Sequence, residues 1–91
     1  MSTPTFMVVA TIRDDTDMAE LQSLIPDEVA HIEQLRSEQR MGAVHIALTR
    51  RTIFIETFAA DEAEAIATVR TLPMGKFFDL DVFDTMPPGG N

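Results

Sequence analysis

Four side chains of this sequence are of the types that transfer protons in catalysis: His45, Glu56, Asp79 and Asp81. General acid–base catalysis requires a group that takes up a proton from the reacting molecule and returns it. A carboxylate or an imidazole with a tuned pKa is the usual choice. We therefore treat these four residues as candidate catalytic groups.

His45 and Glu56 lie in two consecutive predicted strands, 43–49 and 52–58, which most simply form an antiparallel hairpin. If the hairpin is centred between residues 50 and 51, the two side chains stand directly opposite each other, within hydrogen-bonding reach. One would then orient the other for catalysis, or the two would form a structural cross-strand ion pair. Arginines at 50 and 51 do not favour positive φ, so we expect a longer or irregular loop about the same centre. They are solvated loop charges or a pocket rim that attracts anions.

Asp79 and Asp81 belong to a predicted last strand in which polar and apolar residues alternate. They are candidates for a base or for an anchor of a ligand hydroxyl group, or they are ordinary exposed strand acids. Arg13 ends the first predicted strand. It is expected to neutralise one of these acids, or to bind a substrate carboxylate in a forked geometry.

The elements that position these residues follow from hydrophobic periodicity and breaker residues. We predict a strand over 6–13, a helix to about Gln39 that is interrupted at Pro26 and stops near Gly42, the two hairpin strands, a helix over 60–70 and a last strand over 77–83. This βαββαβ order predicts an α+β, ferredoxin-like sandwich: a four-stranded antiparallel sheet with two helices on one face.

Strand alternation divides the sheet into two chemically different faces. The predicted core face carries Val44, Ile46, Leu48, Ile53, Ile55, Phe78, Leu80 and Val82. The opposite face carries His45, Thr49, Phe54, Glu56, Phe58, Phe77, Asp79, Asp81 and Phe83. Aromatic side chains mixed with acids indicate partial cover, most simply by a second copy of the sheet. We expect at least a dimer, with Arg13, Phe54, Phe58 and Phe77 as candidate substrate-binding residues; in the alternative, the phenylalanines only join the copies.

Composition limits the partners and the chemistry. A formal charge of -8 repels phosphate backbones and anionic membranes, so neither nucleic acid nor membrane is an expected partner. The absence of cysteine excludes disulfides and thiolate metal sites, and the two histidines show no metal-ligand spacing. No nucleotide motif is present, so we expect no cofactor and no metal. We predict one domain over 1–86, a flexible tail over 87–91 and, without a signal peptide or spanning segment, a cytoplasmic location.

Several positions resemble a known family. They are Asp27-Glu28 at a helix start, Leu35, Phe54, the Leu72-Pro73-Met74 helix exit and the strand Asp79-Leu80-Asp81-Val82. The segment from Leu24 to Val82 is similar to the muconolactone isomerase family, small proteins of the dimeric α/β-barrel superfamily that isomerise a lactone in catechol breakdown. The resemblance implies this fold, a homo-oligomer with a pocket at or near a subunit interface, and cofactor-independent double-bond isomerisation of a small organic acid or lactone during aromatic compound catabolism.

The chain departs from that family between Met41 and Arg51, where the family is rich in tryptophan, arginine and histidine. This difference keeps two alternatives to the isomerase open. One is a non-catalytic protein that binds a small ligand on the same scaffold. The other is a structural oligomer whose phenylalanine face only joins copies.

Overall fold

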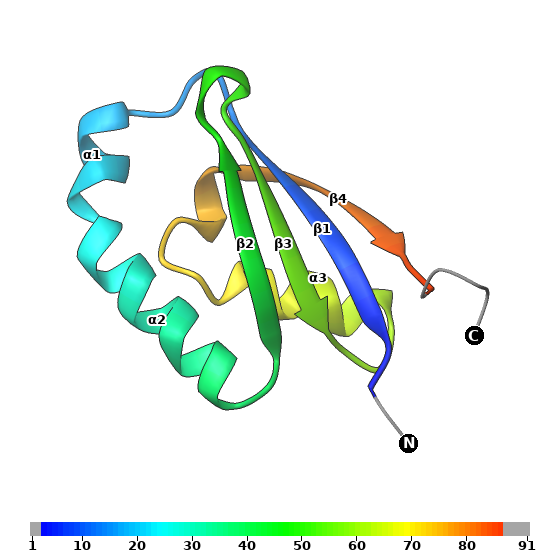
Figure 1. Cartoon of the computed structure of the whole chain (residues 1–91). Helices are drawn as coiled ribbons and strands as arrows, with labels where there is room; N and C mark the ends of the chain where they lie inside the picture. The colour runs from blue at the N-terminus through cyan, green and yellow to red at the C-terminus, as the bar shows by residue number, and fades with distance from the viewer. Residues whose placement is uncertain (1–2, 87–91) are drawn as a thin grey trace.

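A computed structural model describes residues 3–86 of the chain. Its elements are β1 (Thr5–Ile12), α1 (Met18–Ser23), α2 (Ile25–Ser37), β2 (Met41–Ala47), β3 (Thr52–Phe58), α3 (Glu62–Arg70) and β4 (Phe78–Asp84) (Figure 1). Short 3₁₀ turns lie at Leu48–Arg50 (η1) and Gly75–Phe77 (η2). The predicted tail, 87–91, lies outside the described residues.

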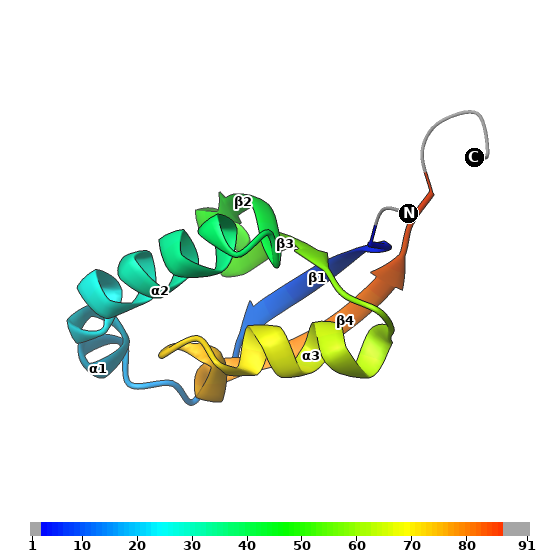
Figure 2. The same ribbon diagram turned by 90° about the horizontal axis from the view of Figure 1, so that it is seen from below.

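The sheet is antiparallel, with strand order β2-β3-β1-β4. α3 contacts β1, β3 and β4, whereas α2 contacts β2. Figure 2 shows α2 and α3 on the same side of the sheet, with α1 next to the start of α2. The predicted α+β, ferredoxin-like architecture is therefore confirmed.

The first helical region is divided into two helices, as Pro26 predicts. The Asp17 carboxylate caps α1 by accepting hydrogen bonds from the backbone N–H groups of Ala19 and Glu20. α2 then begins at Ile25 with Pro26 in its first turn, where a missing N–H costs no helical hydrogen bond.

The expectation that Gly42 stops this helix is wrong. α2 ends at Ser37, and Gln39 takes the left-handed conformation with φ of 59°. The N–H of Arg40 then donates to the carbonyl of Leu35, and that of Gln39 to Arg36, which closes the helix end. Gly42 lies inside β2.

The centre of the hairpin differs from the prediction by one residue. Ala47 pairs with Thr52, and the loop between them is η1 followed by Arg51 in the left-handed region, with φ of 51°. The loop is therefore longer than two residues, as its poor turn chemistry predicts, but it is centred earlier in the chain. The cross-strand pairs from Val44 to Ala47 consequently shift by two positions, and His45 pairs with Phe54, not with Glu56.

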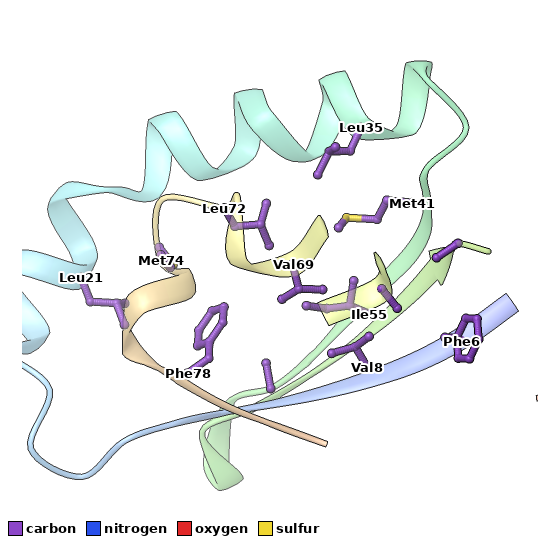
Figure 3. Close-up of a cluster of buried hydrophobic side chains, with 13 residues drawn as sticks. Phe6, Val8, Leu21, Leu35, Met41, Ile55, Val69, Leu72, Met74 and Phe78 are labelled. Atoms are coloured by element: carbon purple, nitrogen blue, oxygen red, sulfur yellow. The ribbon is translucent and has the colours of Figure 1, made fainter. Parts of the chain in front are cut away.

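The core lies between the helices and one face of the sheet. It includes Val8 and Ile55 from the sheet, Leu35 from α2, Val69 from α3 and Phe78 at the start of β4 (Figure 3). Three of the predicted core positions on β3 and β4, Ile53, Leu80 and Val82, are half-buried and pack against it.

Ile46 and Leu48 lie on the helix side of the sheet, as alternation predicts, but they are 68% and 81% exposed instead of packed in the core. Ile46 lies near the end of the edge strand β2, and Leu48 begins η1. The expectation that Phe77 lies on the opposite face is wrong, because Phe77 belongs to η2, before β4 begins, and packs against the core.

Candidate functional site

The face of the sheet opposite the helices, here called the open face, carries most of the predicted site residues. His45 and Phe54 pair across β2 and β3, and Val9 of β1 lies between Phe54 and Asp81 in the sheet. Met7 likewise lies between Glu56 and Phe83. The open face is thus a mixed surface of apolar side chains and acids, and Asp79, Asp81, Phe83 and His45 on it are exposed.

Glu56 is engaged elsewhere than with His45. The register of β2 and β3 shifts between Met41 and Val44, and Oε1 of Glu56 accepts a hydrogen bond of 3.1 Å from the N–H of Ala43 in that bulge. A Cβ atom on Gly42 would lie 2.0 Å from the same oxygen. Gly42 thus leaves the space that the carboxylate occupies, and Glu56 stabilises the bulge.

Arg13 and Asp79 form the pair predicted from the adjacency of the first and last strands. Their Nη1 and Oδ1 atoms are 3.8 Å apart, and the side chains are 41% and 73% exposed. Arg13 also donates to the carbonyl groups of Phe78 and Lys76, which holds it at the start of β4. Such an exposed pair contributes little stability. Phe77 lies away from this face, and the Nζ of Lys76 is 5.1 Å from the centre of its ring.

A cavity of about 320 Å³ lies on the other side of the sheet, between α1 and α2 and the strands β2 and β3. We call it the helix-side cavity. Most of its lining is aliphatic or methionine side chains, and Figure 3 labels five of them: Leu21, Met41, Ile55, Leu72 and Met74. Within residues 3–86, the lining includes two polar side chains, Gln22 and Glu28. An apolar space of this size with few polar groups has the character of a small-molecule site.

Glu28 is the chemically distinctive group of this cavity. Its side chain lies in the first turn of α2, and the residue is only 7% exposed. Oε1 accepts a hydrogen bond of 2.9 Å from the N–H of Met74. In the described part of the chain, Oε2 makes no hydrogen bond.

The pKa of the Glu28 carboxyl is raised above its ordinary value of 4.5, because burial disfavours the charged form. The hydrogen bond from Met74 and the nearby His31 act in the opposite direction and are outweighed. His31 itself is held by Thr71, whose Oγ1 lies 2.9 Å from the Nε2 of the imidazole. A buried carboxyl with a raised pKa inside a cavity is a candidate for proton transfer.

Sequence reasoning missed Glu28 as a functional group and named it only as a helix start. A signal was available. Glu28, Ile32 and Leu35 follow at the spacing of one helix face, so a carboxylate stands on the apolar stripe that faces the core. Buried carboxylates are rare unless they are partnered, so such a position merits attention.

Neither a metal centre nor a membrane segment is found in residues 3–86. No group of three or more histidine, cysteine or acidic side chains in this range is arranged to hold a metal ion. No helix there has the length and apolar character needed to cross a bilayer.

Comparison with known proteins bears on the fold. The chain has the fold of muconolactone isomerase. It superposes on the crystal structure of muconolactone isomerase with a TM-score of 0.71, covering 93% of this chain and 92% of that one, at 19% sequence identity. No family model and no curated protein matches the sequence. The fold predicted by the resemblance is thus confirmed.

Proposed function

We propose that this protein is a cofactor-independent isomerase that acts on a small, largely apolar carbonyl compound such as an unsaturated lactone. The observation that supports it best is the buried carboxyl of Glu28 in the helix-side cavity, with a raised pKa and one free oxygen. The fold shared with muconolactone isomerase is consistent with this chemistry, although fold alone does not determine activity.

The proposed reaction uses one carboxyl group as base and then as acid. Ionised Glu28 takes a proton from the carbon between the carbonyl and the double bond, and the electrons of that C–H bond give a dienolate. The protonated carboxyl then returns the proton to the far end of the dienolate, so the double bond moves into conjugation and Glu28 is ionised again. A raised pKa suits both steps, because a group whose pKa lies closer to neutral pH can both accept and return a proton there.

Gln22 is the second polar side chain of the cavity and is proposed to bind the carbonyl oxygen. Its amide N–H₂ can donate a hydrogen bond, which gains strength as negative charge develops on that oxygen. The aliphatic remainder of the lining excludes water from the dienolate.

The open face is the second candidate location for the chemistry. There His45, Asp79 and Asp81 lie beside Phe54 and Phe83, and a second copy of the sheet would enclose them. In the single chain, the four predicted catalytic residues do not bond to one another in residues 3–86. Glu56 instead accepts a hydrogen bond from Ala43, and Asp79 pairs with Arg13. We propose that a second copy of the chain, in a homo-oligomer, covers this face.

A non-catalytic ligand-binding protein is the alternative function. In that case Glu28 only joins α2 to the turn at Met74, and its raised pKa is a consequence of structural burial. Both functions use the helix-side cavity, but only the isomerase would convert its ligand to a product.

The test is isomerisation of α-angelica lactone, an unsaturated lactone whose double bond is one carbon away from conjugation. ¹H NMR in D₂O follows both the conjugated product and deuterium uptake. We expect turnover above the buffer rate by the wild-type protein and by Glu33→Gln, which removes a carboxylate from the exposed side of the same helix. Glu28→Gln should abolish it. Loss in His45→Ala with turnover retained in Glu28→Gln would assign the chemistry to the open face instead. Binding without turnover in the wild-type protein would leave the ligand-binding function.

A further inference from the structure

The hairpin end of the molecule holds a second pocket, of about 230 Å³. Five residues line both this hairpin-end pocket and the helix-side cavity: Ile12, Met18, Ile46, Leu48 and Ile53. The two spaces therefore share one apolar wall. The hairpin-end pocket adds Arg51 and Thr52, so one end of this groove is cationic while the Glu28 end is a buried carboxyl.

Arg51 is fixed in place rather than extended into solvent. Its backbone has the left-handed conformation, and its carbonyl accepts a hydrogen bond of 2.9 Å from the N–H of Ile12. Its Nη2 atom donates to the carbonyl of Arg13 at 3.3 Å and lies 3.4 Å from the sulfur of Met18. The guanidinium is thereby held against the start of α1.

The hydrogen-bonding capacity of this guanidinium is only partly filled by residues 3–86. Its Nε atom is buried and has no hydrogen-bond partner in residues 3–86. In the same range no carboxylate lies within ion-pair distance of Arg51, and the same holds for Arg50 and Arg70, but of these three arginines only Arg51 lines the hairpin-end pocket. The buried Oγ1 of Thr16 is also without a partner, and the N–H of Thr16 bonds the same Arg13 carbonyl as Arg51 does.

We propose that Arg51 binds the carboxylate head group of the ligand, whose apolar portion extends along the shared wall toward Glu28. The ligand class is then an amphiphilic monocarboxylate, and this deepens the proposed function, on which it rests. Because Arg51 lines the hairpin-end pocket, a ligand carboxylate there supplies the anion that the guanidinium lacks within residues 3–86. The ligand carboxylate and Glu28 would repel each other if both were ionised. The raised pKa of Glu28 reduces this repulsion in part, and the separation of the two groups along the groove reduces it further. The arrangement thus orients the ligand, with its charged end at the hairpin.

The test compares two probes with the same eight-carbon chain and different head groups, octanoate and octan-1-ol. Isothermal titration calorimetry is suitable because the chain has no tryptophan or tyrosine to report binding by fluorescence. Each probe is titrated into the wild-type protein, Arg51→Gln and Arg50→Gln. Arg50 is the matched control, because it is the neighbouring, exposed arginine and lines neither pocket. Amide spectra by ¹H–¹⁵N NMR establish that each variant is folded.

We expect octanoate to bind more tightly than octan-1-ol, and Arg51→Gln to weaken octanoate about tenfold or more, as for a charge-assisted hydrogen bond. Octan-1-ol should bind all three proteins alike. Equal losses in Arg50→Gln and Arg51→Gln would overturn the head-group site, because they would indicate diffuse attraction by the local positive charge of the hairpin loop. Octan-1-ol binding without any preference for octanoate would overturn the head-group site but leave the cavity. Failure of both probes to bind would overturn the cavity as a ligand site as well, and dimerisation through these residues, seen by sedimentation, would assign the groove to a second copy.

Discussion

The Oε1 atom of Glu28 accepts the backbone N–H of Met74 at 2.9 Å, across 46 positions of the sequence. This bond joins the first turn of α2 to the turn that follows α3, and it lies at the cavity lining. The carboxyl group thus makes a structural contact through one oxygen, while within residues 3–86 its second oxygen makes no hydrogen bond and is the one proposed for proton transfer. The two roles can be separated by substitution.

Glu28→Gln should retain the fold, because the amide oxygen of glutamine can still accept the Met74 N–H. Glu28→Ala should lower the free energy of unfolding by about 1–3 kcal/mol, the cost of a buried backbone donor without a partner. Urea denaturation followed by circular dichroism measures both. Equal stability of Glu28→Ala and wild type would show that the bond does not stabilise α2.

The raised pKa of Glu28 predicts a pH-dependent difference in stability. The folded state holds the Glu28 proton more tightly than the unfolded state, so this group stabilises the fold fully below its ordinary value of 4.5. Its contribution is lost as pH rises through the folded pKa. The free energy of unfolding of Glu28→Gln relative to wild type should therefore increase from pH 4 upward and level off above the folded pKa. A difference that is flat across this range would contradict a raised pKa.

Assembly through the open face predicts a different sensitivity on each side of the sheet. Phe54 and Phe83 are 38% and 54% exposed, and Leu48, on the opposite side, is 81% exposed. Phe54→Glu and Phe83→Glu should dissociate the oligomer, because a buried charge without a partner is costly. Leu48→Glu is the control and should leave it intact. Sedimentation velocity measures the oligomeric state of each variant. Dissociation by Leu48→Glu alone would indicate that the interface lies on the helix side of the sheet.

The contact between Gly42 and Glu56 predicts non-additive stability. In Gly42→Ala the added Cβ would lie 2.0 Å from Oε1 of Glu56, so the carboxylate must move and release the N–H of Ala43. A loss of about 1 kcal/mol is expected. The same substitution in a Glu56→Ala background should cost less, because the displaced group is absent. A double-mutant cycle by urea denaturation measures this coupling, and zero coupling would contradict the contact.

The architecture was predictable from sequence because each element carried a strong local signal. Pro26 predicted the division between the first two helices, and alternation placed Ile55 and Phe78 on the core face. The site was less accessible. The hairpin centre depends on Arg51 adopting positive φ, which its side chain does not favour, and that detail decides the partner of His45.

The helix-side cavity was outside the reach of sequence patterns for another reason. Ile46 and Leu48 continue the apolar alternation of the core strands, so alternation cannot distinguish a packed position from the wall of a cavity. That distinction depends on how far α2 covers the edge strand, which is a property of tertiary packing.

The loop between Ala47 and Thr52 also limits which changes in its own length the sheet can tolerate. Successive strand residues face opposite sides, so slipping β2 by one residue exchanges its two surfaces. His45 would then turn toward the helices and Val44 away from them. Loop variants that lengthen or shorten the connection by two residues can preserve both surfaces, whereas a change of one requires a compensating bulge such as the one already present between Met41 and Val44.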